Sequence, residues 1–555
     1  MSTPLPDRAP ASRPTRAQFI AVGAVLLAIA AAQLAQHWRN GRPVDLPDVP
    51  AGKLACMSYT PRQGPQITPG GVSVAQIEAD LALLAAETKC VRTYSSVRGM
   101  EALPPIARRL GLRVLLGIWI GTDPKANEED VATAIAVAKR DRDVIDAIVV
   151  GNEVLLRHEQ PVEVLRGYLE RVRRETALPV TYADVWEFWR RGAALADAVD
   201  FITIHILPYW EDDPVAVEAA LQHLRDVHAQ MQAEFPGRRL LIGETGWPTQ
   251  GRQREGARPG VVNAARFVRE FVAYADAHAL PYNIIEAYDQ PWKRAAEGTV
   301  GGYWGLFDAE GRPKYPLQGP VIEDPRWRVG WYAALAGALL LAGIGFASRA
   351  ARGQGLALLA VAGLAGGGVA YAQWRYHLPA NRGAVEWASS LAALVCGWWL
   401  YLRVVMDVAR QHAGTATATA YVAGAQVLRE ACSGRHPLRG AVAGARLTSV
   451  LRLALLFGVA YVSLGLALDG RFRDFPVATV LLPVTALGLR QWALQPGFDS
   501  PGIEETMLAA IALAAAVLII LLEGPRNGAA WLWCALSAVL ALSVLHAGMR
   551  APRQH

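Results

Sequence analysis

Two glutamates stand at the ends of short apolar runs that lie far apart in the chain. Glu153 directly follows Ile148–Asn152, and Glu244 directly follows Leu240–Gly243. If both runs are strands that end at one mouth of a fold, two carboxyl groups meet there. Such a pair is the minimal chemistry for breaking a glycosidic bond with retention, one group serving as acid and base and the other as nucleophile. Asn152 would then bind the sugar 2-hydroxyl, a contact that strengthens in the transition state.

The two glutamates are predicted to have different roles because their surroundings differ. A single glutamate at a strand end is more often solvated or salt-bridged, so the hypothesis depends on the pair. We expect hydrogen bonds to hold Glu244 ionised, with Tyr209 as one donor. The negative charge of Glu244 should raise the pKa of Glu153 and keep a proton available for the leaving oxygen. A carboxyl separation of about 5 Å would give retention.

The elements that must position this pair form an eightfold repeat of strand and helix. Helical patterns lie between the apolar runs, at 74–88, 131–140, 161–176, 214–234 and 257–279. The predicted strands are Leu54–Tyr59, Cys90–Ser95, Arg113–Ile120, Ala147–Asn152, Val180–Ala183, Phe201–Leu207, Leu240–Gly243 and Tyr282–Ala287. This alternation over about 250 residues predicts a (β/α)8 TIM barrel at 45–325. An open doubly wound sheet is the alternative, but no glycine-rich fingerprint follows the first strand, so a dinucleotide is not expected.

In such a barrel the carboxyl ends of the strands carry the active site, and here they are rich in aromatic, acidic and amide side chains. Aromatic faces suit pyranose rings, and polar groups suit their hydroxyls. The predicted substrate-binding residues are Tyr59, Arg92, Tyr94, Asn152, Trp186, Tyr209, Trp247, Glu286, Asp289, Trp292 and Lys293. For Trp247 and Trp304 a packing role is equally open. His205 is expected to be a buried hydrogen-bonding residue. No spacing of His, Asp or Cys indicates a metal, and no cofactor is expected.

The remainder of the chain has the composition of a membrane domain. Overall, 52 % of the residues are hydrophobic and only 19 % are charged, and the formal net charge is +6. The arginines cluster between apolar runs, a pattern typical of membrane topology rather than of nucleic-acid binding. A signal anchor, or a cleavable signal peptide, is predicted at 19–36. Seven further spans are predicted at 329–347, 355–373, 387–406, 448–468, 476–493, 506–523 and 529–547.

The loop charges predict an orientation for these spans. Arg8 and Arg13 precede the first span, the connections 348–352 and 407–446 are arginine-rich, the latter including Arg439, and Arg553 lies in the tail. Loops 374–384 and 469–475 carry competing arginines, so the bias is not uniform. We expect a cytoplasmic N-terminus at 1–18, a periplasmic barrel, and a transmembrane domain of about seven helices at 327–550 in a bacterial inner membrane, with the lipid bilayer as partner.

Three smaller features refine this prediction. Charged side chains are nearly absent from the middles of the spans, which argues against an ion-coupled transporter. Gly363 and Gly367 offer a face for close helix packing. Of the five cysteines, Cys56 and Cys90 lie in the first two predicted strands. They would be able to form a disulfide in an exported domain, but two separate buried thiols are the favoured interpretation.

At these residues the chain resembles glycoside hydrolase family 17. The matching motifs are Val150-Gly151-Asn152-Glu153, Gly243-Glu244-Thr245-Gly246-Trp247-Pro248, the run from Ile284 to Lys293, and Tyr303-Trp304-Gly305-Leu306-Phe307. The resemblance covers about residues 52–320. It implies a retaining enzyme acting on β-1,3-glucan, with Glu153 as acid/base and Glu244 as nucleophile. The membrane helices make the chain more similar to bacterial membrane-bound members associated with periplasmic glucans than to secreted plant and fungal members.

The sequence leaves the outcome of the reaction open, since water or a second glucan can accept the glycosyl group. The leading hypothesis is a membrane-anchored β-glucan hydrolase or transglycosylase. The alternative is a glucan-binding or export module, in which the barrel feeds polymer to a membrane channel; a structural anchor is a third. A glucan synthase remains open as a partner, although the C-terminal half has no room for a glycosyltransferase domain.

Overall fold

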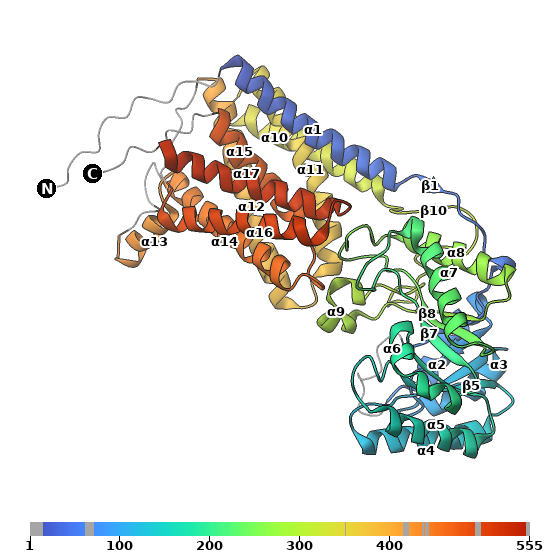
Figure 1. Cartoon of the computed structure of the whole chain (residues 1–555). Coiled ribbons are helices and arrows are strands. Elements are labelled where there is room, and N and C mark those ends of the chain that lie inside the picture. Colours follow the sequence, from blue (N-terminus) through green and yellow to red (C-terminus); the bar gives the residue numbers. More distant parts are fainter. Residues whose placement is uncertain are drawn as a thin grey trace. The chain divides into compact units, whose positions relative to one another are not determined.

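The computed structural model of the chain divides into two compact units (Figure 1). Pro43–Glu323 form one unit, and Met1–Arg42 with Asp324–His555 form the other. The structure describes residues 15–61, 71–349, 351–414, 421–435, 438, 443–493 and 501–550. The residues Arg8, Arg13, Arg439 and Arg553, which entered the prediction of topology, lie outside the described residues.

The first unit is built on a closed barrel of eight parallel strands, which confirms the predicted fold. Each strand pairs with the next one along the chain, and β9 closes the barrel on β2 through Met57 and Ile284. The strands are β2 (Met57–Ser58), β3 (Cys90–Arg92), β4 (Arg113–Ile118), β5 (Ile145–Asn152), β6 (Val180–Val185), β7 (Ile202–His205), β8 (Leu240–Thr245) and β9 (Tyr282–Ile284). All eight predicted strands are present, although several are shorter than predicted.

Helices follow the strands as the apolar spacing predicts. They are α2 (Val74–Glu87), α3 (Leu103–Arg109), α4 (Pro124–Arg140), α5 (Val162–Thr176), α6 (Trp186–Arg191), α7 (Val217–Glu234), α8 (Val261–Ala277) and α9 (Arg294–Gly301). Short 3-10 turns lie at Pro50–Gly52, Met100–Ala102, Ala193–Ala198 and Pro291–Lys293. Helix α4 begins seven residues before its predicted start at Val131, because Asp123 caps the amide of Lys125 and Pro124 occupies the first helical turn.

Side chains of the barrel strands alternate between two packed regions. In β5, Ile148 and Val150 pack outward into the large core beneath the helices. Val149 belongs instead to a small separate cluster that also includes Leu115, Ala183 and Leu241 from neighbouring strands. This alternation follows from the period of two along a strand. It means that residues such as Arg92, two positions after the inward Cys90, also point into the barrel.

Cys56 and Cys90 form a disulfide between the start of β3 and the segment just before β2. The favoured interpretation of two separate thiols is therefore wrong. Both side chains are buried in the small inner cluster, and the pairing of β2 with β3 brings their backbones together. Sequence composition does not distinguish two buried thiols from a bonded pair, because both are small apolar side chains in adjacent strands.

The ends of the barrel segment are fastened to each other. Strand β1 (Pro43–Val44) pairs with β10 (Val321–Ile322) in antiparallel fashion, as Figure 1 shows. Beside them the Arg269 side chain of α8 is fully buried and donates to the carbonyls of Leu46 and Gly319 and to the carboxylate of Asp48. One buried guanidinium thus joins the segments that enter and leave the barrel.

The second unit is helical. Its helices are α1 (Arg16–Asn40), α10 (Trp327–Ala347), α11 (Gln354–Ala380), α12 (Ala384–His412), α13 (Gly424–Cys432), α14 (Ala443–Leu468), α15 (Val477–Ala493), α16 (Ile503–Glu523) and α17 (Gly528–Arg550). Among the described residues, seven of these are long and apolar enough to cross a membrane. The eighth predicted span is the shorter apolar helix α15, which has Pro483 in its interior.

Packing within the helical unit explains two of its glycines. A Cβ atom on Gly363 would lie 2.1 Å from the carbonyl oxygen of Gly337, and one on Gly367 would lie 2.0 Å from that of Ala333. Helices α10 and α11 therefore pack in backbone contact, which confirms the predicted close face. Elsewhere in the unit Arg452 of α14 pairs with Glu505 of α16 at 3.0 Å, and both side chains are buried.

The disulfide gives the first testable prediction. Replacing Cys56 and Cys90 together by alanine should lower the free energy of unfolding of the barrel by about 2–4 kcal/mol, because the unfolded chain loses a cross-link. The measurement is a denaturant titration of the full chain in detergent, followed through protease resistance of the barrel. Replacing the exposed thiol Cys432 by alanine is the matched control and should leave the midpoint unchanged. Equal midpoints for the double variant and the wild type would contradict the bond.

Candidate active site

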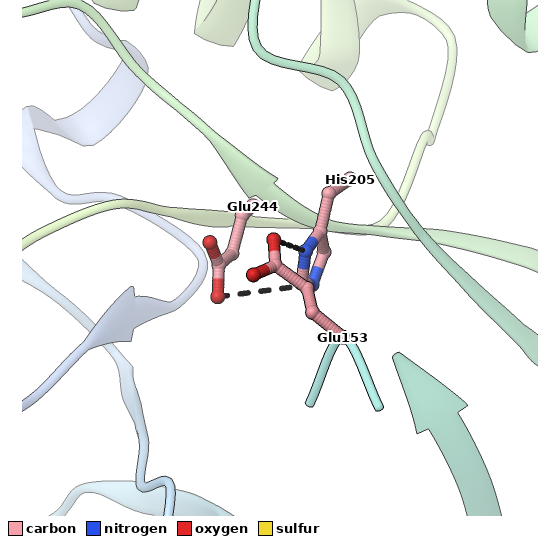
Figure 2. A group of neighbouring side chains, drawn as sticks. All are labelled: Glu153, His205 and Glu244. Atoms are coloured by element: carbon pink, nitrogen blue, oxygen red, sulfur yellow. Dashed lines mark hydrogen bonds and ion pairs between the residues drawn. The ribbon is translucent and has the colours of Figure 1, made fainter. Parts of the chain in front are cut away.

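The two glutamates lie together at the carboxyl ends of the barrel strands, with His205 beside them (Figure 2). Glu153 directly follows β5, Glu244 lies near the end of β8, and His205 ends β7. The Nδ1 atom of His205 lies 3.0 Å from Oε1 of Glu153, and its Nε2 atom lies 3.7 Å from Oε1 of Glu244. One oxygen of each carboxyl group lies within 4.8 Å of the other. Barrel closure thus brings together residues that are 91 positions apart in the sequence.

The backbone after β5 is shaped to aim Glu153. Gly151 has a φ of 81° and Glu153 a φ of 54°, both in the left-handed region. A glutamate in that region costs of order 1–2 kcal/mol, which the surrounding structure must offset. A Cβ atom on Gly151 would lie 2.8 Å from Cγ2 of Val154, so glycine is required by space as well as by conformation. Backbone strain at this point is therefore coupled to the direction of the carboxyl group.

Glu244 is held by Tyr94 and Arg92. The Tyr94 hydroxyl donates to Oε1 of Glu244 at 2.8 Å, and Nη1 of Arg92 lies 3.3 Å from the same oxygen. Tyr209, which the sequence suggested as the donor, instead donates to the carbonyl of Arg252 at 2.6 Å, so that prediction is wrong. Both tyrosines follow barrel strands, but only the side chain from β3 points into the barrel mouth.

Arg92 is the cation that joins the two halves of the site. Its guanidinium is buried and donates to the carbonyl of Gly243 at 2.7 Å and to Oδ1 of Asn152 at 2.5 Å. Because the Asn152 oxygen is engaged by Arg92, its amide nitrogen is oriented away from that cation. The guanidinium thus sets the orientation of the residue next to Glu153 as well as that of Glu244.

A chain of hydroxyl and amide groups supports Tyr94 from behind. The Tyr94 hydroxyl lies 2.8 Å from Oγ of Ser58, which in turn accepts from Nδ2 of Asn283 at 2.8 Å. A phenol has one proton, so Tyr94 can donate to Glu244 while it accepts from Ser58. Asn283 also donates to the carbonyl of Gly243 at 2.7 Å. Ser58 and Asn283 were not identified from the sequence, since small polar residues inside short strands carry no distinctive signal.

The pKa of Glu153 is lowered, contrary to the predicted rise. Burial alone would raise it, but the hydrogen bond to His205 and the positive charges of His205 and Arg157 outweigh burial. Arg157 Nη1 lies 3.4 Å from Oε2 of Glu153. The prediction considered only the negative charge of Glu244, whereas two neighbouring cationic side chains dominate in the folded chain.

A second group of charges follows β9. Lys293 donates to both carboxylate oxygens of Glu286 at 2.9 Å, and burial raises the pKa of Glu286 even against this pairing. Lys314 pairs with Asp289, whose pKa burial raises to about 6. Burial also raises the pKa of Glu297 on α9 to about 7, in the field of Glu286, Glu153 and Glu244. Glu297 was not identified from the sequence, because it lies on a helix rather than at a strand end.

The aromatic residues of the predicted site separate into exposed and buried sets. Trp292 is 43 % exposed, and Trp119, which follows β4, is 40 % exposed with the Arg157 guanidinium 4.5 Å from its ring centre. Trp186 is partly buried, and its Nε1 atom has no hydrogen-bond partner among the residues that the structure describes. The exposed rings are the ones available to a sugar face.

Two further residues that the sequence predicts to bind substrate, Tyr59 and Trp247, lie away from the barrel mouth. The Tyr59 hydroxyl donates to Asp80 of α2, behind the barrel wall. Trp247 is buried, donates to the carbonyl of Arg258, and packs edge-to-face on Tyr209. These residues belong to the core between barrel and helices, where strand-end position alone does not separate them from the mouth.

Within the described residues, Glu153, His205 and Glu244 each offer one atom that a metal ion would accept as a ligand. Arg92 lies 3.4 Å from Nε2 of His205 and 3.3 Å from Glu244. Arg92 therefore places a permanent positive charge beside two of these three side chains.

Paired glutamates at the mouth of a (β/α)8 barrel define the class of a carboxylate-dependent glycoside hydrolase. Residues 56–305 match the model of the BtgE/BtgC glycoside hydrolase domain. This match agrees with the resemblance to glycoside hydrolase family 17 for the barrel, which is similar to glycoside hydrolase domains of the BtgE/BtgC type.

Individual relatives and solved structures are similar to part of this chain. A glucan 1,3-beta-glucosidase of Candida albicans is 27 % identical over 271 residues, covering 44 % of this chain and 86 % of its own length. One from Saccharomyces cerevisiae is 26 % identical over 272 residues, covering 44 % and 85 %. The crystal structure of a family 17 beta-1,3-glucanosyltransferase from Rhizomucor miehei has a TM-score of 0.43 at 22 % identity, covering 49 % of this chain and 98 % of that chain.

The contrast between the two tyrosines gives a second prediction. Tyr94→Phe removes the hydroxyl that donates to Glu244 and should lower the glycosidase kcat/KM by about 10- to 100-fold, the value of a hydrogen bond to a charged group. Tyr209→Phe removes a hydroxyl of the core and should leave kcat/KM of the folded enzyme within about threefold of wild type. Steady-state kinetics of both full-length variants test this. Equal losses in the two variants would contradict the placement of Tyr94.

Proposed function

We propose that this chain is a membrane-tethered, retaining glycosidase or glucanosyltransferase that acts on β-1,3-glucan. The observation that carries the proposal is the approach of a Glu153 oxygen to within 4.8 Å of a Glu244 oxygen at the barrel mouth. Retaining enzymes place their carboxyl groups about 5 Å apart, whereas inverting enzymes leave room for a water molecule between them.

The roles of the glutamates follow from their contacts. Tyr94 and Arg92 donate to Glu244 and favour its ionised form, which suits a nucleophile that attacks the anomeric carbon. Glu153 faces it from the opposite wall and protonates the departing oxygen. In the second half of the reaction Glu153 takes the proton of the acceptor hydroxyl, and the sugar is released from Glu244 with its original configuration.

The substrate assignment is supported by the relatives, which are named as glucan 1,3-beta-glucosidases. The exposed rings of Trp119 and Trp292 provide faces on which glucosyl units can stack. Lys293 and Glu286 present a buried charged pair to the sugar hydroxyls. Arg92 and Asn152 together position the amide that binds the 2-hydroxyl.

The cellular placement is part of the same proposal. A disulfide in the barrel is typical of an oxidising compartment outside the cytoplasm. Seven described helices are apolar and long enough to cross a membrane, and the arginine-rich connections favour a barrel on the far side from them. The proposed location is the inner membrane of a bacterium, with residues 45–325 in the periplasm and 327–550 in the bilayer.

The test uses the full chain in detergent with reducing-end-labelled laminari-oligosaccharides, and mass spectrometry of the products. Glu244→Ala and Glu153→Gln are the control variants and should reduce turnover at least about 100-fold. Products longer than the donor would establish glucanosyl transfer, and only shorter products would establish hydrolysis. Binding without turnover in the wild type would contradict an enzyme and favour the alternative of a glucan-binding module.

A further inference from the structure

His205 lies where it can move a proton between two states of the carboxyl pair. We propose that His205 stores the proton that Glu153 delivers to the leaving oxygen, and that loss of the Glu244 charge during attack releases it. His205 is a positioning residue in this scheme, because it acts through Glu153 and not on the sugar. The inference rests on the proposed function of the two glutamates.

The hydrogen-bond geometry fixes how His205 carries its proton. Nη1 of Arg92 lies 3.4 Å from Nε2 of His205, and a guanidinium only donates. A neutral His205 therefore accepts at Nε2 and carries its hydrogen on Nδ1, which donates to Oε1 of Glu153 at 3.0 Å. In this state Glu153 is ionised and has no proton to give.

His205 and Glu153 together can hold one additional proton in either of two ways. An imidazolium can face an ionised Glu153, or a neutral imidazole can face a protonated Glu153. The two forms differ by a proton shift along the 3.0 Å contact between Nδ1 and Oε1, followed by rotation of the carboxyl group toward the sugar. The additional proton therefore belongs to the pair and not to either residue alone.

The charge of Glu244 decides which form is favoured. Ionised Glu244 lies 3.7 Å from Nε2 of His205 and favours the imidazolium, whereas the Arg92 guanidinium, 3.4 Å from the same atom, opposes it. When Glu244 forms its bond to the anomeric carbon, its negative charge is lost and the imidazolium loses that partner. The proton then moves from Nδ1 to Glu153 and on to the departing oxygen, leaving an ester at Glu244, a free hydroxyl on the leaving group and a neutral His205. The second half-reaction runs these steps in reverse.

The surroundings of His205 are closed enough for such coupling. Its side chain is fully buried. A Cβ atom on Gly243 would lie 2.3 Å from Cγ2 of Thr203 and 3.3 Å from Nε2 of His205. The absence of a side chain at Gly243 therefore leaves space for both neighbours. The charged groups around it are Glu153 from the β5 end, Glu244 from β8, Arg92 from β3 and Asp184 from β6.

Of these groups, Asp184 is engaged elsewhere. Its carboxylate accepts from the Tyr182 hydroxyl and from the amides of Val185 and Leu155, and burial raises its pKa to about 6. The lowered pKa of Glu153 supports the same scheme from another direction. Burial alone would raise that pKa, and the hydrogen bond to His205 is the first of the causes that lower it, so the imidazole is the neighbour that governs the proton on Glu153.

The decisive variant is His205→Asn in the full chain. The asparagine amide can still donate to Glu153 but cannot carry a proton. Cleavage of laminari-oligosaccharides, whose leaving group needs protonation, should fall about 100-fold or more. The kcat/KM for 2,4-dinitrophenyl β-laminaribioside, which reports only the first half-reaction, should stay within about fivefold of wild type, since the phenolate departs without an acid. Glu153→Gln should show the same dependence on the leaving group.

The pH dependence of kcat/KM distinguishes a proton relay through His205 from a purely structural role of that residue. The alkaline limb of kcat/KM in the wild type reports loss of the shared proton. A carboxyl group alone holds that proton less tightly than the pair does, so His205→Asn should shift the limb toward acid by at least about one pH unit. Equal losses on both substrates with an unchanged limb would overturn the relay.

Two further outcomes separate this inference from the proposed function. If the wild type cleaves neither substrate, the proposed function fails and the relay with it. If the wild type and Glu153→Gln behave as expected while His205→Asn is fully active on oligosaccharides, the relay alone fails. If His205→Asn does not fold, nitrogen NMR of the wild type can be used in its place. The imidazole signal of His205 is identified as the one that Glu153→Gln perturbs. Trapping a fluorosugar on Glu244 should move that signal toward the neutral form, and no change would overturn the relay.

Discussion

The buried guanidinium of Arg92 is the interaction on which the site depends. Two carboxylates within 4.8 Å of each other would repel strongly in the interior of a barrel. Arg92 supplies a permanent positive charge that contacts Glu244, His205 and Asn152 from one position inside the barrel. Burying that cation is costly unless its donors are paired, and the carbonyl of Gly243 meets one of them. Electrostatics therefore explains both the closeness of the glutamates and the direction of their neighbours.

The barrel makes this arrangement possible because each contribution arrives on a different strand. Arg92 comes from β3, Glu153 from the end of β5, His205 from β7 and Glu244 from β8. Parallel strands that close on themselves deliver all their carboxyl ends to one mouth, whatever the length of the intervening helices. The disulfide and the β1–β10 pairing act on the frame and not on the site.

The sequence was informative where a pattern has one physical solution. Eight apolar runs alternating with helical periodicity led directly to the closed barrel, and the glutamates were found because each ends such a run. The direction of a side chain was not available in the same way. Tyr94 and Tyr209 both follow strands, yet one contacts Glu244 and the other contacts Arg252, since strand shear and irregular pairing near the mouth decide which side chain points inward.

Long-range electrostatics was the other feature that the sequence did not provide. The lowered pKa of Glu153 depends on His205, which is 52 positions away, and on Arg157, which reaches back from the following turn. The same holds for Glu297, which acquires its raised pKa from burial beside charges on other elements. In the helical unit, α15 begins within one residue of the predicted span although Pro483 lies in its interior.

If Glu153 and Glu244 act as a retaining pair, as we propose, the anomeric configuration of the first product reports it. Proton NMR of the full chain turning over a β-1,3-linked oligosaccharide can follow the new reducing end before mutarotation. We expect the β-anomer to appear first and the α-anomer later, at the rate of spontaneous mutarotation. An α-anomer formed first would show inversion, and would contradict the proposal that Glu244 bonds to the sugar.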